Sequence, residues 1–362
     1  MPHTLIIPAP VDPHVHLRGL DWAHKGTFTS ETGAALAGGY AAVLDMPNTP
    51  PATVTPEALN LKMKAMAQES VSDWGVYYGA GLFADAAVYA YIADDICGIK
   101  MYCNATTGDL LIEDSALREA HFAAWKRAGN IKPIAVHAEG ETVAQILALT
   151  RKYDIHTHFC HISTAEEIGY LQQAKADGLP VSIGVTPHHL YLTEDDVPRL
   201  GAFGLMKPAL KTRHDQQALW AAVSSGLVDV IESDHAPHTL EEKSSERIYY
   251  GVPGLETTIP LLCLALHEKR ITEQQLVKLV ATNPRRIFHI AHDVNTYTAI
   301  DPDAAYEIQN KNLFTACGWS PFSGMQVRGK ITGVWIRGTQ VFNGEKIRVP
   351  AGFGRNIWHQ PL

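Results

Sequence analysis

The sequence contains neither a long hydrophobic run nor a strongly basic stretch. Among its 362 residues, no apolar segment approaches the length of a membrane span. Residues 1–4 do not form the basic region that precedes the apolar part of a secretory signal. The formal net charge is -8, and no cluster of lysine and arginine reverses this balance. We therefore expect no membrane segment, no signal peptide and no nucleic-acid partner.

Cysteine is scarce as well. The five cysteines are an odd number without CxxC spacing, which favours reduced thiols over a disulfide framework. The sequence also lacks low-complexity segments and Gly/Ser-rich linkers that would divide it. Its content of 46% hydrophobic and 19% charged residues is typical of a globular protein. These features predict a cytoplasmic globular protein that is long enough for one large α/β barrel.

What the sequence does contain is a regular alternation of short apolar runs with amphipathic stretches. A first strand is expected from residues 5–7 toward the histidines at 14 and 16, and others at 41–46, 75–79, 98–102, 133–137, 155–162, 181–185 and 228–233. Helical patterns lie between them, for example at 30–37, 56–68 and 115–127. This order predicts a parallel sheet with right-handed crossovers. Eight such strands form a (β/α)8 TIM barrel, whose active site lies at the C-terminal strand ends.

The pattern changes near Pro321. Residues 331–336 and 346–349 alternate between apolar and polar side chains, with a turn-forming Asn343-Gly344 between them. This predicts a β-hairpin appended to the barrel, which pairs with residues 4–7 to form a small β region or partial β-sandwich. We therefore expect a barrel over residues 9–320 and an appended β region formed by residues 1–8 and 321–362.

Two histidines near the start of the chain are the first candidate site. His14 and His16 are separated by one residue, so in an extended strand both side chains lie on the same face and can reach one metal ion. The alternative is a surface pair with satisfied hydrogen bonds. The other predicted strands decide between these readings.

Polar residues at four more predicted strands belong to the same end of the barrel. Lys100 lies in the strand at 98–102, His137 ends the strand at 133–137, and His161 and Asp234 lie at the ends of two later strands. Together with the first two histidines, these six residues converge on the catalytic face. Nitrogen and oxygen donors without a required thiolate fit zinc, and manganese and cobalt stay open.

Other polar residues near the strand ends have simpler readings. His188 and His189 are expected in a structural turn. His156 and His158 precede His161 in one strand, and at most one of them, His158, is expected to face the site. Cys160 is expected to be a buried, inert thiol, with a soft metal ligand as the alternative.

Several motifs resemble those of the dihydroorotases, which belong to the amidohydrolase superfamily. They are DPHVHLR at 12–18, DMPNT at 45–49, GIKMY at 98–102, HAE at 137–139, CHIS at 160–163 and SDHAPH at 233–238. The likeness continues through PGLET at 253–257, NPRRIF at 283–288 and GWSPF at 318–322. With TLEEK at 239–243, it is strongest to the dihydroorotase domain of the animal multifunctional pyrimidine-synthesis protein.

The resemblance implies a centre of two zinc ions. One ion would be held by His14, His16 and Asp234, and the other by His137 and His161. Lys100 would bridge both as an Nζ-carboxylate formed with CO2, because a free ammonium beside two dications is strongly disfavoured. A bridging water would be the nucleophile, with Asp234 as the catalytic acid and base.

The resemblance also implies binding sites for the substrate's carboxylate and ring. The guanidinium of Arg18 is suited to bidentate pairing with a carboxylate, and Asn48 and His238 offer further donors. A polar loop at 104–109 would close over the substrate through Thr106. Further substrate contacts are expected from Pro253 and Gly254.

The sequence departs from the family pattern at a few positions. Gly184 stands where some animal-type relatives carry a glutamate that helps to hold a third zinc ion, which argues against a third metal here. Thr107 replaces an aromatic residue of the closing loop, so closure is expected to differ. Gly19-Leu20-Asp21 replaces the usual acidic residue and proline. None of these changes affects an expected metal ligand.

The activity implied by the resemblance is the reversible cyclisation of N-carbamoyl-L-aspartate to (S)-dihydroorotate in pyrimidine biosynthesis. A hydantoinase or allantoinase is a second reading, but a neutral substrate would leave the Arg18 guanidinium without a partner. A third reading is a non-catalytic scaffold for aspartate transcarbamoylase, against which the six retained ligands argue. A homodimer is the default expectation, and association with a transcarbamoylase stays open.

Overall fold

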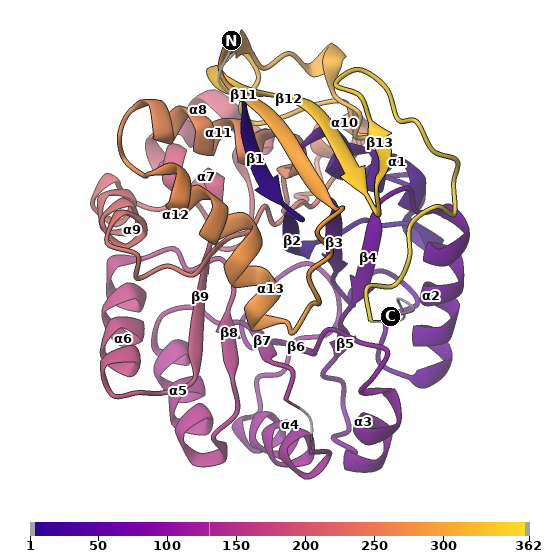
Figure 1. Ribbon diagram of the computed structural model, residues 1–362. Coiled ribbons are helices and arrows are strands. Elements are labelled where there is room, and N and C mark those ends of the chain that lie inside the picture. Colours follow the sequence, from indigo (N-terminus) through magenta and orange to yellow (C-terminus); the bar gives the residue numbers. More distant parts are fainter. Residues whose placement is uncertain (1–3, 130, 359–362) are drawn as a thin grey trace.

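Parallel strands form a closed barrel in the computed structural model, which describes residues 4–129 and 131–358 (Figure 1). The barrel segments are β2 (Val11–Val15), β3 (Ala42–Asp45), β4 (Asp73–Val76), β5 (Tyr78–Gly79), β6 (Ile99–Tyr102), β7 (Ile134–His137), β8 (Thr157–Phe159), β9 (Val181–Val185) and β10 (Val230–Ile231). Only Tyr77 separates β4 from β5, so these two segments share one of the eight barrel positions.

The strand pairing shows how the barrel closes. Strands β2, β3 and β4 pair in parallel, and so do β5 to β10 in chain order. The first barrel strand, β2, is joined to the segment that follows β10. Val15 pairs in parallel with His235, and the His16 N–H donates to the His235 carbonyl at 2.7 Å. The predicted (β/α)8 TIM barrel is therefore confirmed.

Helices follow the strands and surround the barrel (Figure 1). The helices are α1 (Phe28–Ala37), α2 (Pro56–Glu69), α3 (Ala86–Ile92), α4 (Ser115–Arg127), α5 (Glu141–Tyr153), α6 (Ala165–Ala176), α7 (Pro187–Tyr191), α8 (Val197–Leu200), α9 (Arg213–Ser224), α10 (Leu240–Lys243), α11 (Leu255–His267), α12 (Glu273–Val277) and α13 (Asn283–Ile287). Short 3-10 or π turns lie at Leu20–Trp22, Glu194–Asp196, Gly201–Gly204, Lys278–Thr282 and Asn310–Asn312. Among the described helices, none is both long and apolar enough to cross a lipid bilayer.

Most of these helices begin at a side chain that caps their free N–H groups. Thr164 accepts from the Glu167 N–H, and the Glu167 carboxylate accepts in return from the Thr164 N–H. This capping box fixes where α6 begins, and the same kind of cap starts α1, α9 and α12. The local sequence thus sets the helix starts that follow the strands.

A second, antiparallel sheet lies beside the barrel. It consists of β1 (Leu5–Pro8), β11 (Tyr297–Glu307), β12 (Gln326–Ile336) and β13 (Thr339–Phe342), in the order β1-β11-β12-β13 (Figure 1). Residues 5–7 belong to this sheet, as predicted for the appended β region, and pair with β11; the other prediction, that they begin the first barrel strand, is wrong. The first barrel strand is β2, and the chain bends between the two at Ala9, whose φ is 43°.

The appended hairpin also differs from its prediction. The hairpin of β12 and β13 turns at Arg337-Gly338, where both φ angles are positive. A second turn follows at the predicted Asn343-Gly344, where the Asn343 N–H donates to the Lys346 carbonyl at 3.3 Å. Residues 346–349 contribute only a bridge between Ile347 and Phe342. The strand β11 was not predicted, because its acidic segment at 301–303 interrupts the alternation and shifts the register against β12. The antiparallel sheet therefore begins earlier in the chain than Pro321.

Candidate active site

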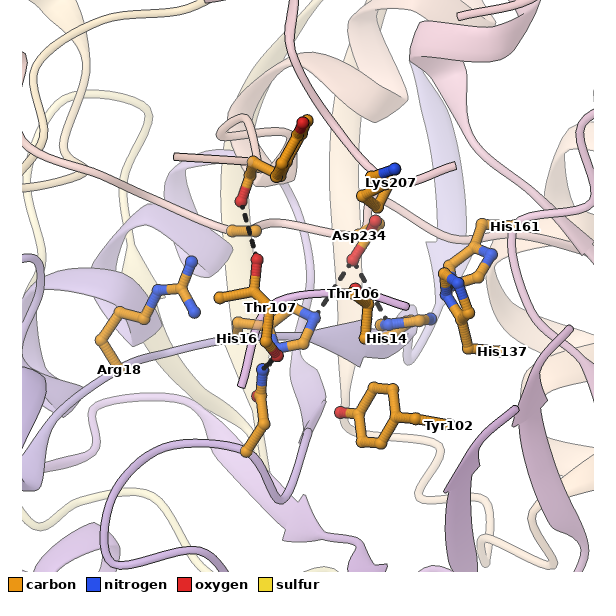
Figure 2. A pocket seen from close by; sticks show the side chains of 14 residues that line it. His14, His16, Arg18, Tyr102, Thr106, Thr107, His137, His161, Lys207 and Asp234 are labelled. Carbon is orange, nitrogen blue, oxygen red and sulfur yellow. Dashed lines mark hydrogen bonds and ion pairs between the residues drawn. The ribbon is translucent and has the colours of Figure 1, made fainter. Parts of the chain in front are cut away.

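A cavity opens at the C-terminal ends of the barrel strands (Figure 2). The residues that line it come from the strand ends and from the loops that follow them: His14, His16, Arg18, Asn48, Tyr102, Thr106, Thr107, His137, His161, Lys207, Asp234, Ala236, Tyr250 and Gly251. In Figure 2, His137 and His161 lie on one side of the cavity, Arg18 lies on the other side, and Asp234 lies between them. The barrel thus gathers polar side chains from distant parts of the sequence.

The first group of side chains is centred on Asp234. Its Oδ1 lies 3.3 Å from Nε2 of His14 and 3.2 Å from Nε2 of His16. One potential ligand atom from each of these residues lies within 4.8 Å of the others. The other nitrogen of His16, Nδ1, lies 2.8 Å from Oδ1 of Asn48 and must donate to it. The lone pair of His16 therefore sits on Nε2, facing the carboxylate.

The second group consists of His137 and His161. Nδ1 of His137 lies 3.0 Å from Nε2 of His161, and Nε2 of His137 lies 3.2 Å from Oε1 of Glu139. Since a carboxylate accepts hydrogen bonds, Nε2 of His137 carries the proton and its Nδ1 turns a lone pair toward His161. The buried Nδ1 of His161 has no hydrogen-bond partner among the described residues.

Burial keeps these imidazoles neutral. It lowers the pKa of His14 and of His161 well below the usual value, and it lowers the pKa of His16 and of His137 in the same direction. A neutral imidazole offers the lone pair that a metal ion needs. Several neutral imidazoles and one carboxylate facing a common space form a donor set that fits zinc.

Lys100 lies beneath the cavity, on β6. Its side chain is fully buried, and its Nζ lies 3.2 Å from Sγ of Cys160. In the part of the chain that the structure describes, no carboxylate forms an ion pair with this amine. The positive charge of Lys100 also helps to lower the pKa of His14, His137 and His161. A buried ammonium without an anionic partner is costly.

Arg18 forms the opposite wall of the cavity. Its side chain is buried, its Nε donates to the Pro237 carbonyl at 3.0 Å, and its Nη2 lies 3.2 Å from Nε2 of His238. Burial lowers the pKa of Arg18 to about 10, so the guanidinium remains charged at neutral pH. No ion pair involves Arg18 among residues 4–129 and 131–358. The arrangement leaves a cation that can pair with an anion in the cavity.

A loop covers the cavity between these two sides. Thr106 and Thr107 line it, and the Thr107 carbonyl accepts from Nδ2 of Asn48 at 3.0 Å. The Thr107 hydroxyl donates to the Tyr250 carbonyl at 3.2 Å, which ties this loop to the segment after α10. The loop expected at 104–109 therefore lies at the mouth of the barrel.

Some of the predicted residues lie outside the cavity wall. His238 does not line it and contacts two residues that do, Arg18 and, at 3.1 Å from its Nε2, the Tyr250 carbonyl. Pro253 and Gly254 do not line it either; the Gly254 N–H instead donates to Nδ1 of His235 at 3.2 Å. His158 does not face the cavity either, because it contacts Ser182. The pair His188 and His189 belongs to α7, as the structural reading of these residues expected.

Two charged residues of the site were not predicted from the sequence. Lys207 lines the cavity with its Nζ 4.9 Å from the centre of the Tyr250 ring, and it belongs to a long loop without a strand-end signal. Glu232 is fully buried and lies against His14 and His161. Glu232 directly follows β10 and lies within the strand predicted at 228–233, and a carboxylate inside an apolar strand was a usable signal.

The fold is a (β/α)8 barrel with clustered histidines at its mouth, and solved hydrolases share this fold. The L-hydantoinase (dihydropyrimidinase) from Arthrobacter aurescens superposes with a TM-score of 0.92 at 23% identity, over 97% of this chain and 88% of that one. The inactive dihydroorotase-like domain of the Chaetomium thermophilum CAD-like multifunctional protein superposes with a TM-score of 0.80 at 21% identity, over 98% and 99%. No protein-family model matches the chain.

Sequence relatives define the family more narrowly. The dihydroorotase of Halobacterium salinarum is 34% identical over 97% of this chain and 89% of its own length. The multifunctional protein pyr1-3 of Dictyostelium discoideum is 41% identical over 97% of this chain, which spans only 16% of that protein. The chain belongs to the dihydroorotase family, as the motifs predicted.

Proposed function

We propose that this protein is an active dihydroorotase that interconverts N-carbamoyl-L-aspartate and (S)-dihydroorotate in pyrimidine biosynthesis. The observation that carries the proposal is the combination of a histidine–aspartate cluster with a buried guanidinium on the opposite wall of one cavity. A cyclic amide that carries a carboxylate needs both a hydrolytic centre and an anion partner. Membership of the dihydroorotase family supports the same conclusion.

The centre would hold two zinc ions. His14, His16 and Asp234 would hold one ion, and His137 and His161 the other. When bound, zinc supplies a Lewis acid that polarises the amide carbonyl and makes water more acidic. The neutral imidazoles and the lone pairs described above fit such ions, and manganese or cobalt would use the same donors.

Lys100 would bridge the two ions after its Nζ has been carboxylated by CO2. The ammonium first releases one proton to solvent, the free amine then attacks the carbon of CO2, and the N–H that this step makes acidic releases a second proton, so that a cation becomes an anionic oxygen ligand. This change removes an unfavourable buried positive charge and replaces it with the negative charge that two dications require. The absence of an ion pair to Lys100 among the described residues supports this role.

The remaining residues would bind the substrate and move its proton. Arg18 would pair with the free carboxylate, with His238 against its Nη2 and Asn48 nearby, and Thr106 would cover the ring. Asp234, which faces two imidazoles through one oxygen, would take a proton from the attacking water and deliver it to the leaving nitrogen. Pro253 and Gly254 would act only after some movement of their loop.

Hydantoinase activity is the main competing function, because hydantoinases share this fold. The buried guanidinium decides against it, since a neutral hydantoin would leave Arg18 without an anion. The inactive dihydroorotase-like domain from Chaetomium thermophilum has the same fold, so a non-catalytic role is the second competing function. Retention of all six expected ligands supports an active enzyme.

The test is a dihydroorotate hydrolysis assay combined with metal analysis of the same purified sample. We expect hydrolysis of dihydroorotate and its formation from carbamoyl aspartate in the reverse direction. We also expect about two metal ions per chain, as the proposed two-zinc centre requires. Faster turnover of 5-substituted hydantoins would instead establish a hydantoinase. A protein without turnover and with far less than two ions per chain would establish a non-catalytic homologue.

We also propose a cytoplasmic setting and a homodimer, and association with aspartate transcarbamoylase is a second interaction to test. All five cysteines are free and buried, which suits a reducing compartment. The multifunctional relative shows that a domain of this kind occurs within a longer protein. Light scattering of the purified chain, alone and with a transcarbamoylase, measures both associations.

A further inference from the structure

One buried carboxylate contacts both halves of the candidate metal centre without lining the cavity. Oε1 of Glu232 accepts from the His161 N–H at 2.6 Å and lies 3.5 Å from Nδ1 of His14. Its other oxygen, Oε2, lies 3.0 Å from Nε2 of His158. Glu232 has no exposed surface, so these neighbours compensate for the cost of burying its charge.

The neighbouring strand provides the space for this carboxylate. Gly184 lies on β9, and a Cβ atom added there would lie 2.5 Å from Oε1 and 2.6 Å from Cδ of Glu232. Any side chain at position 184 would therefore overlap the carboxylate. The glycine at this position and the glutamate on the next strand form a matched pair, which explains the departure from the family pattern at Gly184.

We propose that Glu232 is a positioning residue that orients His14 and His161 for metal binding. A carboxylate beside Nδ1 of His14 favours the tautomer with the proton on Nδ1, which leaves the lone pair on Nε2, toward Asp234. The same carboxylate holds the backbone of His161, whose φ of 38° is unusual for a residue other than glycine. One side chain thereby sets the orientation of one histidine from each half of the centre.

The position of Cys160 suggests an alternative role for Glu232, as a direct metal ligand. Ligand atoms of His14, Cys160 and Glu232 lie within 4.8 Å of one another, so the carboxylate could instead bind a further ion directly. A positioning residue changes the affinity of the two proposed ions but not the number bound at saturation. A direct ligand changes the number bound.

The positioning role rests on the proposed metal centre. The experiment measures zinc binding in the absence of substrate, and its result therefore does not depend on dihydroorotase activity. The variants are Glu232→Gln, Glu232→Ala and the double variant Gly184→Asp/Glu232→Ala. An aspartate oxygen lies two bonds from its Cβ, so Asp at position 184 returns a carboxylate to the vacated space. Asp73→Asn is the matched control, because Asp73 is a buried carboxylate at the opposite barrel end, paired with Arg337.

We expect Glu232→Gln to weaken zinc binding by about 10-fold and Glu232→Ala by up to ~100-fold, the range for residues that support metal ligands. All variants still bind two ions at saturating zinc, and the double variant recovers affinity relative to Glu232→Ala. Asp73→Asn lowers the urea midpoint of unfolding and leaves zinc affinity unchanged.

Three results would overturn the positioning role. The first is wild-type zinc affinity in Glu232→Ala. The second is a loss of affinity without any recovery in the double variant, when that variant unfolds at the same urea concentration as Glu232→Ala. The third is three ions per wild-type chain and two per Glu232→Gln chain, which would make Glu232 a ligand.

Discussion

The two ends of the barrel differ in whether selected buried charges have a partner within the protein. At the N-terminal strand ends, Asp73 is paired with Arg337, and Nζ of Lys132 donates to the carbonyls of Ala93 at 2.7 Å and Ile96 at 2.6 Å. At the C-terminal ends, Lys100 and Arg18 are buried without an ion pair to any described residue. The charges of Asp73 and Lys132 at the base thus have partners within the protein, whereas the two cations at the mouth have no ion pair among the described residues.

Removing the buried amine at the mouth should have the largest effect. We expect Lys100→Met to lower dihydroorotate turnover by at least ~100-fold, because the proposed bridge between two ions cannot form. The side chain is apolar and similar in length, so the unfolding transition of the metal-free protein should not shift to lower urea. The measurements are steady-state kinetics and metal content, and wild-type activity in this variant would exclude the bridge.

Removing the guanidinium should weaken substrate binding while leaving the metal ions in place. For Arg18→Gln we expect a loss of ~10–100-fold in kcat/KM, as a charged hydrogen bond worth ~1.5–3 kcal/mol is lost. The loss should be specific to substrates with a carboxylate. Kinetics with dihydroorotate and with an uncharged cyclic amide measure this; equal losses on both substrates would contradict the anion clamp.

At the opposite end, the same kind of change should affect stability alone. We expect Asp73→Asn to lower the free energy of unfolding by ~1.5–3 kcal/mol, since a charged hydrogen bond to Arg337 is lost. Activity at 25 °C should remain at the wild-type level, because the residue lies far from the cavity. Urea unfolding and kinetics on one preparation test this, and a large loss of activity would show that the two ends are coupled.

Lower pH should destabilise the metal-free protein through histidines at both ends. Burial, together with nearby positive groups, lowers the pKa of His156 to about 4, and burial also lowers the pKa of His189 to about 4. Between pH 6.5 and 4 the unfolded chain binds protons that the folded chain excludes, so stability falls as the pH falls. The expected slope is ~1.4 kcal/mol per pH unit for each histidine. Urea unfolding of the wild type and of His156→Gln between these pH values measures the contribution of His156. An identical dependence of the free energy of unfolding on pH in the two proteins would contradict this contribution.

The smallest effect is expected at the loop over the cavity. Thr107→Val removes the hydroxyl that donates to the Tyr250 carbonyl and keeps the shape of the side chain. We expect a loss of ~0.5–1.5 kcal/mol, seen as a rise of about 2–10-fold in KM. Thr107→Ser keeps the hydroxyl and is the control. A wild-type KM in Thr107→Val would mean that this hydrogen bond does not help to hold the loop closed.

The prediction succeeded where a signal was local and periodic. The strand ends that carry His137 and His161 were identified because short apolar runs with a polar terminus mark barrel strands. It failed where pairing depended on distant residues. Nothing near Leu5 shows that it pairs with Ile300, and nothing near Gly184 shows that a carboxylate from the next strand fills its space.

The sequence by itself determined the order of strands and helices, the helix caps and the residue types at the mouth, because each depends on neighbours along the chain. The tertiary structure alone decided which side chains meet, since barrel closure brings residues more than 200 positions apart into contact, as at His16 and Asp234. It also decided which buried charges have partners. Pairing in a folded core depends on distances in space, and the distance along the chain does not set them.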